Sequence, residues 1–266
     1  MATASTTTVG TDLYHEVRGS GPALLMIPGA TGDAGHFTRS AERLSDAFTV
    51  ITYDRRGNSR SLVNADAPAT ATMAAQADDA AALIRACGFS QAVVFGTSGG
   101  ALVALELLAR HPEVVRGAII HEPPLISLLP HQDGPDPLAP IFQLAQTDPR
   151  AALEAFVKLN SSDTAWQTIE PATRERMLGN AVNLFQREIA QFLSYMPDAK
   201  VLSALTVPVV LVRSREGLPF AAAVQAWLEA QLGVTGGTLS GHHAPYFDMP
   251  DVFAEELRPI VRQLWS

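Results

Sequence analysis

The 266-residue sequence contains a single cysteine, Cys87, and no long hydrophobic run. One thiol cannot form a disulfide within the chain, and it excludes a metal site built on several thiolates. Cys87 lies in the apolar segment AALIRACGF, where we expect it to pack in the core. No segment approaches the roughly 20 apolar residues of a membrane span. The N-terminal MATASTTTVG lacks the basic start and apolar run of a signal peptide. We therefore expect a cytoplasmic protein without a membrane partner.

Positive charge is also scarce, because 19 Lys and Arg face 27 Asp and Glu, for a net charge of −8. No basic cluster overrides this balance, so a nucleic-acid partner is not expected. Apolar material is plentiful, since 47% of the residues are hydrophobic. That composition excludes a disordered chain. It suits one large α/β domain, or a core with a modest insertion.

Short apolar runs alternate with helical patterns over the first 120 residues. The runs that predict strands are residues 13–17, 23–27, 49–53, 92–95 and 115–120. Helical spacing is found in residues 37–44, in residues 73–87 and after residue 99. Mostly apolar strands that alternate with helices predict a parallel sheet covered on both faces. Right-handed crossovers would gather the functional positions along one edge of this sheet.

The pattern changes between residues 125 and 203, which we call the lid. A proline-broken loop, LISLLPHQDGPDPLAP, precedes amphipathic helical segments with no convincing strand among them. These segments are residues 141–144, 151–159, 174–184 and 189–196. The sheet is expected to resume afterwards, with strands at 207–212 and 237–239 and helices at 220–232 and 252–265. We therefore expect residues 1–124 and 204–266 to form the core, with the lid placed over the sheet edge.

Residues 91–110, QAVVFGTSGGALVALELLAR, place a G-x-S-x-G between an apolar strand and a helix. The turn is so tight that Gly96 and Gly100 must lack side chains. It holds Ser98 in a strained conformation, with its hydroxyl above the sheet edge and the following N–H groups at a helix N-terminus. The alternative is a Gly-Ser loop that merely joins a strand to a helix. The strand before and the helix after favour Ser98 as a nucleophile.

A serine nucleophile needs a base, usually a histidine that a carboxylate orients. Of the seven histidines, His242 and His243 follow the last predicted strand and precede the closing helix, in GHHAPYFDMPDVF. The other five lie in segments without a motif of this kind, and we expect them to be structural or at the surface: His15, His36, His111, His121 and His131.

The chain resembles the α/β-hydrolase superfamily from end to end, through PGATG, YDRRGNSRS, GTSGG, and GHH followed by Asp-x-Pro. This resemblance implies an α/β fold, in which helices flank a mostly parallel sheet and the lid is inserted after the sixth core strand. In that family the catalytic histidine usually stands seven residues before this proline. Counting back from Pro250 gives His243, with Asp248 in the usual acidic place between them. His242 then replaces the usual glycine, and it either packs behind the base or makes a polar contact to the substrate.

The position of the carboxylate that would orient His243 departs from the common pattern of the family. Most members of the family carry an Asp a few residues beyond the strand that matches residues 207–212, where this chain offers only Glu216. A second candidate is Glu122, in HEPP after the preceding core strand. It resembles the acid of the fungal lactone hydrolases that open zearalenone, and the gap from Ser98 (122 − 98 = 24) is the one that this resemblance predicts. Pro123 biases Glu122 towards extended backbone. We favour Glu122 and keep Glu216 as the alternative; a loop carboxylate paired with an arginine is the structural alternative for Glu122.

The tetrahedral intermediate of acyl transfer needs preorganised donors for its negative oxygen. The N–H of Gly99, after the nucleophile, is the first, and the resemblance supplies the N–H of Ala30 as the second. Thr31 could add a hydroxyl nearby. The Asp54-Arg55-Arg56-Gly57 turn is expected to be held by salt bridges. Apolar lid side chains are expected to form a hydrophobic pocket, and the candidates for substrate contact are Leu125, Leu128, Leu129, Trp166, Met177, Leu184, Phe185 and Phe192.

Together these residues predict a serine hydrolase that cleaves a hydrophobic ester or lactone through an acyl-serine intermediate, without a metal or a cofactor. The Glu acid and HEPP favour lactones, including zearalenone-like macrocycles. A C–C bond hydrolase or a metal-free perhydrolase would use the same triad, and a small-molecule receptor on this fold remains a different class. Serine at the tight turn argues against haloalkane dehalogenase and epoxide hydrolase chemistry, which needs a carboxylate nucleophile there. The sequence leaves the oligomeric state open, with a homodimer as one alternative.

Overall fold

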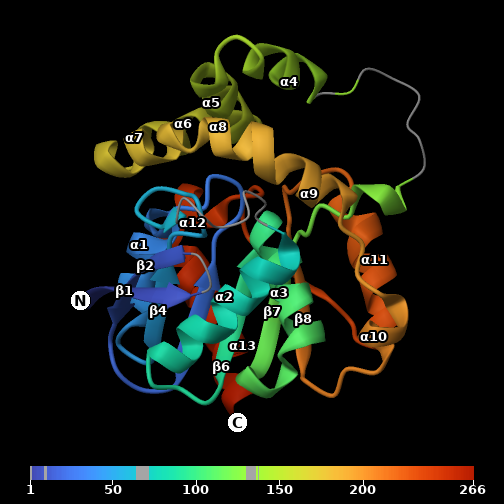
Figure 1. Cartoon of the computed structure of the whole chain (residues 1–266). Coiled ribbons are helices and arrows are strands. Elements are labelled where there is room, and N and C mark those ends of the chain that lie inside the picture. The colour runs from blue at the N-terminus through green and yellow to red at the C-terminus, as the bar shows by residue number, and fades with distance from the viewer. Residues whose placement is uncertain (1, 9–10, 64–71, 130–135, 137) are drawn as a thin grey trace.

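Figure 1 shows the computed structural model, which describes residues 2–8, 11–63, 72–129, 136 and 138–266. A nine-stranded sheet has the order β1-β2-β4-β3-β6-β7-β8-β9, and β5 pairs with β2 off this path. Strands β4 to β9 along this order are parallel, whereas β1, β2 and β5 pair antiparallel at one side. The strands are β1 (Ala2–Thr8), β2 (Thr11–Arg18), β3 (Ala23–Ile27), β4 (Thr49–Tyr53), β5 (Leu62–Val63), β6 (Ala92–Thr97), β7 (Val115–His121), β8 (Val209–Ser214) and β9 (Gly237–Leu239).

Helices cover both faces of this sheet, and alternate side chains of each strand point to opposite faces. Along β3, Leu25 and Ile27 join the apolar cluster of α2, α3 and α11, whereas Leu24 and Met26 join the cluster of α1 and α13. The predicted α/β fold with a mostly parallel sheet is therefore confirmed. The core helices are α1 (Thr38–Leu44), α2 (Met73–Ala86), α3 (Gly99–Arg110), α10 (Ala199–Ser203), α11 (Ala221–Leu232), α12 (Pro245–Asp248) and α13 (Pro250–Trp265), with 3-10 turns η1 (Ala34–Phe37), η2 (Pro112–Val114) and η3 (Ile126–Leu128).

The strand bounds follow the sequence closely, with two instructive differences. Strand β8 begins at Val209 and not at residue 207, because Pro208 lacks an N–H and contributes only its carbonyl, which accepts from Ala118. Strand β1 was not predicted, because ATASTTT has no apolar alternation. It pairs with β2 at the margin of the sheet, where polar side chains are tolerated.

Between β7 and β8, the described residues form helices and no strand. Helices α4 to α9 lie above the end of the sheet where β6 passes into α3 (Figure 1). Helix α10, which belongs to the predicted lid segment, lies beside α11 along the core (Figure 1). The lid follows β7, the sixth strand in chain order when the two-residue β5 is left out. Its helices are α4 (Ala139–Ala145), α5 (Pro149–Asn160), α6 (Asp163–Thr168), α7 (Pro171–Gly179), α8 (Ala181–Asn183), the π-helix η4 (Leu184–Glu188) and α9 (Ile189–Ser194).

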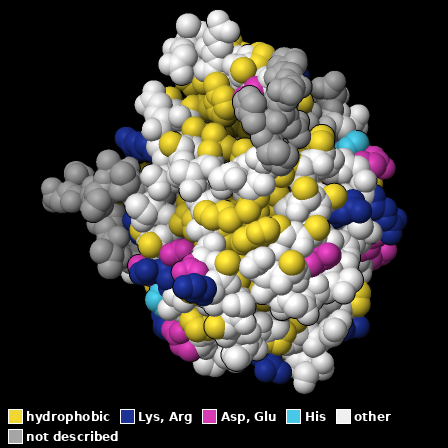
Figure 2. All heavy atoms as spheres, turned by 90° about the vertical axis from the view of Figure 1, so that its right-hand side faces the viewer, with side chains coloured by type: hydrophobic (Ala, Val, Ile, Leu, Met, Phe, Trp, Pro, Cys, Tyr) yellow, Lys and Arg dark blue, Asp and Glu magenta, His cyan; other side chains and the backbone are white. Residues whose placement is uncertain are grey.

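The surface near α9, α10 and α11 is partly apolar. Figure 2 shows hydrophobic side chains exposed on this face, between the lid and the core, while charged side chains lie mostly towards its margins. A homodimer stays a prediction. Across the residues that the structure describes, no helix combines the length and the apolar character that crossing a bilayer requires.

Candidate active site

Ser98 occupies the sharp turn between β6 and α3. Its φ of 53° and ψ of −126° lie far from strand or helix values, so the predicted strain is confirmed. A Cβ atom on Gly96 would lie 2.5 Å from the carbonyl oxygen of Gly100, and one on Gly100 would overlap the carbonyl oxygen of Ile27. Both glycines are therefore required by close backbone contact, and the turn raises the Ser98 hydroxyl above the sheet.

His243 follows β9, and the structure places it against Glu122. Its Nδ1 atom lies 2.5 Å from Oε2 of Glu122, and both side chains are buried. The other carboxylate oxygen accepts the backbone N–H of Ser214 at 2.8 Å. A carboxylate that accepts from Nδ1–H leaves Nε2 as the unprotonated nitrogen, which is the arrangement that a general base requires.

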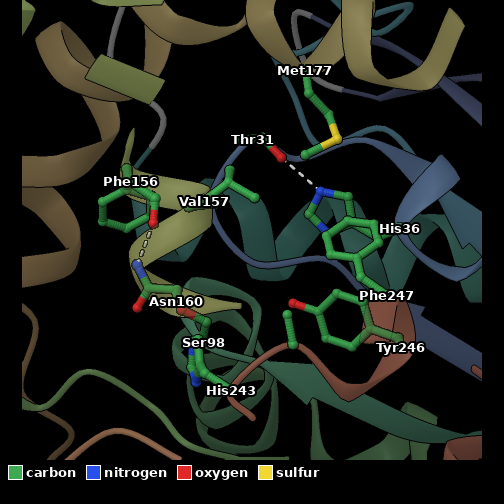
Figure 3. Close-up of a pocket in the computed structure, with 12 residues that line it drawn as sticks. Thr31, His36, Ser98, Phe156, Val157, Asn160, Met177, His243, Tyr246 and Phe247 are labelled. Atoms are coloured by element: carbon green, nitrogen blue, oxygen red, sulfur yellow. Dashed lines mark hydrogen bonds between the residues drawn. The ribbon is translucent and has the colours of Figure 1, made fainter. Parts of the chain in front are cut away.

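The Ser98 and His243 side chains line the same cavity and lie together at one end of it (Figure 3). The structure therefore brings together all three residues that the sequence proposed for the triad. The three come from the ends of β6 and β7 and from the loop after β9, because parallel strands deliver their carboxyl ends to one edge.

The backbone of Glu122 does not follow the prediction made from Pro123. The φ angle of Glu122 is 45°, in the left-handed region, so the expected extended conformation is wrong. This turn at the end of β7 directs the side chain towards β8 and His243. The two hydrogen bonds of the carboxylate, to Ser214 and His243, offset the local preference.

Glu122 is held in its ionised form. Burial by itself would raise the pKa of this carboxyl, but the hydrogen bond and charge of His243, the nearby His121 and the Ser214 N–H together hold the pKa below its ordinary value. A carboxylate that stays ionised can stabilise an imidazolium when His243 takes up a proton.

Glu216, the alternative acid, lies at the surface. Its side chain is 66% exposed and its Oε2 atom lies 3.3 Å from Nε2 of His242. His242 also contacts the backbone carbonyl of Glu216 through Nδ1, at 3.3 Å. The structure thus pairs these two residues with each other at the surface, away from the buried contact between Glu122 and His243.

His121, which we expected from the sequence to be structural or at the surface, is buried and lies next to the site. Its ring stacks on that of His243, with centroids 5.9 Å apart and planes 20° apart. Nδ1 lies 2.8 Å from Oγ1 of Thr97, and Nε2 lies 3.0 Å from Oγ of Ser214. Burial lowers the pKa of His121 to about 4, so its imidazole is neutral beside the triad. No local motif marks this residue, because its position depends on the pairing of β7 with β6 and β8.

The two backbone groups proposed for the oxyanion flank Ser98. Ala30 lines the same cavity as Ser98. It follows Gly29, where a Cβ atom would lie 2.9 Å from Cβ of Ser98. Gly99 begins α3 and is covered by Phe192 of the lid, whose Cζ atom would lie 2.8 Å from a Cβ placed on Gly99. Main-chain donors thus lie beside the Ser98 side chain in the loop after β3 and at the start of α3.

Thr31 and His36 form a buried pair in the cavity wall. Oγ1 of Thr31 lies 2.6 Å from Nε2 of His36, as the dashed line in Figure 3 shows. Burial lowers the pKa of His36 to about 4, and its Nδ1 atom has no hydrogen-bond partner among the described residues. An N–H group on Nδ1 would be buried without an acceptor, so we assign the proton of the neutral ring to Nε2. Nε2 then donates to Oγ1 of Thr31, and the hydroxyl proton of Thr31 is free to donate to another group. The sequence predicted His36 to be structural or at the surface, and it did not indicate this contact in the cavity wall.

The cavity itself measures about 40 Å³. Residues of the core and of the lid helices α5 and α7 line it together (Figure 3). The lining residues are Ala30, Thr31, His36, Ser98, Phe156, Val157, Asn160, Met177, His243, Ala244, Tyr246 and Phe247. Most of the lining surface is apolar, and the polar groups come from Thr31, Ser98, Asn160, Tyr246 and the two histidines.

Among the predicted substrate contacts, Thr31 and Met177 line this cavity and the others lie elsewhere. Trp166, Leu125, Leu184 and Phe192 are buried in the apolar cluster that joins the lid to the core, and Leu128, Leu129 and Phe185 pack against that cluster. His242 lies at the surface beside Glu216. An amphipathic pattern identifies a buried helix face but not what the face is buried against, which is why Phe156, Val157 and Asn160 were missed.

The predicted salt bridges of the Asp54–Gly57 turn are present. Arg56 pairs with Asp79 of α2 at 2.6 Å, and Asp54 pairs with Arg60 at 2.7 Å. Arg55 pairs with Glu188 of the lid at 2.8 Å.

In the described part of the chain, no three His, Cys, Asp or Glu side chains come together as a metal site would require.

Known proteins resemble this chain over nearly its whole length. A model of the alpha/beta hydrolase family matches residues 24–256. YraK, an uncharacterised hydrolase of Bacillus subtilis strain 168, is 32% identical over 261 residues, which cover 96% of this chain and 94% of YraK. A zearalenone hydrolase of Bionectria ochroleuca is 29% identical over 266 residues, with 96% of each chain covered. The enol-lactonase of Burkholderia xenovorans LB400 has the same fold, with a TM-score of 0.74 at 19% identity, over 97% of this chain and 100% of the enol-lactonase.

Proposed function

The chain belongs to the alpha/beta hydrolase family, and we propose that it is a serine hydrolase that cleaves a hydrophobic carboxylic ester or lactone. The observation that carries the proposal is the junction of Ser98, His243 and Glu122 at one sheet edge, with the 2.5 Å contact between His243 and Glu122 at its base. This set of groups is the one that nucleophilic acyl transfer needs.

In the acylation step, Nε2 of His243 takes the proton of the Ser98 hydroxyl while Oγ attacks the substrate carbonyl. The tetrahedral oxygen becomes negative and is held by the N–H groups of Ala30 and Gly99, each worth about 3 kcal/mol. Glu122 stabilises the imidazolium that forms. The intermediate collapses, the C–O bond to the alkoxide breaks, and His243 gives its proton to that oxygen.

In the deacylation step, His243 takes a proton from water, and the hydroxide oxygen attacks the acyl-serine carbonyl. A second tetrahedral intermediate collapses to the free acid, and Ser98 regains its proton from His243. With a lactone, the alkoxide stays attached to the acyl group, so the product is a single hydroxy acid.

A lactone substrate is supported by the resemblance to zearalenone hydrolase and by the Glu at the end of β7. The apolar lining around Phe156, Met177 and Phe247 suits a hydrophobic acyl group, and the hydroxyl proton of Thr31 suits an oxygen of the substrate.

The test is a panel of activated esters and of lactones of graded ring size, zearalenone included, assayed with the purified protein and with Ser98→Ala. We expect multiple turnovers by the wild type and a loss of at least about 10⁴-fold with Ser98→Ala, whose folding is checked by circular dichroism. A fluorophosphonate probe should add its phosphonyl mass to the peptide that contains Ser98. Activity retained by Ser98→Ala would remove this residue from the mechanism. A single turnover that ends in a stable adduct would favour a receptor over an enzyme.

A further inference from the structure

Arg55 lies directly behind the loop that supplies the second oxyanion donor. Its guanidinium is fully buried and donates from Nε to the carbonyl oxygen of Pro28 at 3.0 Å and from Nη2 to that of Gly29 at 2.9 Å. One rigid, planar cation thus donates hydrogen bonds to two consecutive carbonyls of the loop. No other part of the proposed mechanism uses this residue.

The Gly29 contact has a direct consequence for Ala30. The carbonyl of Gly29 and the N–H of Ala30 belong to one planar trans peptide group, in which the C=O and N–H bonds point in opposite directions; no cis peptide bond occurs in the described residues. A donor that holds the carbonyl oxygen therefore also fixes the direction of the N–H. A charged donor draws electron density towards that oxygen and makes the N–H a stronger donor, by roughly 10–30% in condensed-phase estimates.

The lid supplies the partner that holds Arg55. Glu188, the last residue of the π-helix η4, accepts from Nη1 with Oε1 at 2.8 Å and from Nη2 with Oε2 at 2.9 Å. Asn58 donates a further hydrogen bond to Oε1 at 2.9 Å, and Gln76 accepts from Nη1. A buried ion pair contributes little net stability, and a π-helical turn such as η4 occurs frequently at functional sites. Both generalisations favour a positioning role for the pair over a purely stabilising one.

The same lid segment also contacts the first oxyanion donor. Phe192 lies one helical turn beyond Glu188, with its ring 5.3 Å from Cζ of Arg55. That ring covers Gly99 so closely that a Cβ on the glycine would lie 2.8 Å from Cζ of Phe192. Residues 188–192 therefore contact the Ala30 donor indirectly, through Arg55, and the Gly99 donor directly, through the packing of Phe192.

We propose that Arg55 is a positioning residue of the oxyanion hole and that Glu188 of the lid holds it in register, so that the docked lid completes the site. The inference rests on the proposed function. In this proposal the Asp54–Gly57 turn and η4 contribute to stabilising the transition state. Their salt bridges alone would give them only a structural role. A docked lid then has a stronger oxyanion hole than a displaced one.

The experiment compares Arg55→Lys and Glu188→Gln with the wild type and with Arg176→Lys as a matched control. Lysine keeps the charge of Arg55 but cannot hold two carbonyls and both oxygens of Glu188, and glutamine keeps the shape of Glu188 without its charge. Arg176 joins the lid to Asp33 at 2.8 Å and does not hold the Gly29 carbonyl. The readouts are kcat and KM for an activated ester, and the Kd of phenylboronic acid, which forms a tetrahedral adduct with a serine nucleophile.

We expect Arg55→Lys to lower kcat and weaken phenylboronic acid binding by about 10- to 100-fold, since complete loss of one donor costs about 10²–10³. Glu188→Gln should lose about tenfold in both. KM should stay within about threefold, and Arg176→Lys should leave kcat near the wild-type value. Equal losses in all three variants, or a change confined to KM, would overturn the inference in favour of simple lid anchoring.

The outcomes separate this inference from the proposed function. A wild-type protein that neither turns over esters nor binds phenylboronic acid at Ser98 overturns both together. A wild type that does so, with variants that match it, overturns the inference alone. Urea unfolding identifies a variant that fails to fold; if Arg55→Lys does, Glu188→Gln decides the outcome, because its side chain has nearly the same volume.

Discussion

His243 and Glu122 are 121 positions apart in the sequence, and Nδ1 of His243 lies 2.5 Å from Oε2 of Glu122. The carboxylate comes from the end of β7 and reaches across to the end of β8, where its second oxygen accepts the N–H of Ser214. It thereby fills the place next to His243 that an acid after β8 would otherwise take. Glu216, which does follow β8, points to the surface.

The first prediction concerns the choice of acid. Glu122→Ala should lower kcat by about 10³-fold or more, because the imidazole loses both its orientation and the charge that stabilises its protonated form. Glu216→Ala, at an exposed position, should change kcat by less than about threefold. Steady-state assays on an activated ester decide between them, and the reverse ranking would move the acid to the residue after β8.

A second prediction concerns Gly217, which contacts the triad without belonging to it. A Cβ atom on this residue would overlap Oε1 of Glu122 and lie 3.0 Å from the carbonyl oxygen of Ser214. Gly217→Ala should therefore displace the carboxylate and lower kcat by about tenfold or more. Gly237→Ala is the control, because a Cβ there meets no atom within 4 Å. Unchanged activity of Gly217→Ala would mean that the Glu122 carboxylate can shift without cost.

The third prediction concerns acid stability. Burial lowers the pKa of His36 and of His121 from 6.5 to about 4. Such a group stabilises the fold fully above pH 6.5, and this contribution is lost as the pH falls from 6.5 towards 4, because the unfolded chain takes up the proton first. Between pH 7 and pH 5 each histidine should therefore cost about 2 kcal/mol of unfolding free energy.

Urea unfolding of the wild type and of His121→Asn at both pH values measures this effect. The variant should be less stable at pH 7, since it loses contacts to Thr97 and Ser214. Its further loss between pH 7 and pH 5 should be smaller than that of the wild type by about 2 kcal/mol. Parallel losses in the two proteins would show that the pKa of His121 is the same in the folded and the unfolded chain, and so is not lowered by burial.

The fourth prediction concerns the cavity wall. Thr31→Val removes the hydroxyl that contacts His36 at 2.6 Å and leaves a buried imidazole nitrogen without a partner, which should cost about 1–3 kcal/mol of unfolding free energy. Thr31→Ser keeps the hydroxyl and should stay close to the wild type. The comparison is made by urea unfolding at pH 7. Equal stability of the two variants would mean that the hydrogen bond contributes nothing.

The sequence by itself determined the parts of this protein that depend on neighbouring residues. The bend at Ser98 follows from glycines two residues away on either side, and the bounds of β3 and β4 follow from short apolar runs. Sterics and hydrophobic burial act over a few positions, so these features can be predicted from a short stretch. His243 came instead from the resemblance to a family, with its spacing to Pro250.

Tertiary structure alone decided which distant side chains meet. The selection of Glu122 over Glu216 as the neighbour of His243 depends on β7 and β8 being adjacent in the sheet, although residues 122–208, which include the whole lid, separate the two strands in the sequence. The same pairing brings His121 against His243, and the docking of the lid brings Glu188 to Arg55. An apolar periodicity predicts that one face of a helix or strand is buried. The residues that the face packs against depend on the order of the strands and on where the lid docks, because residues in contact can be far apart in the sequence.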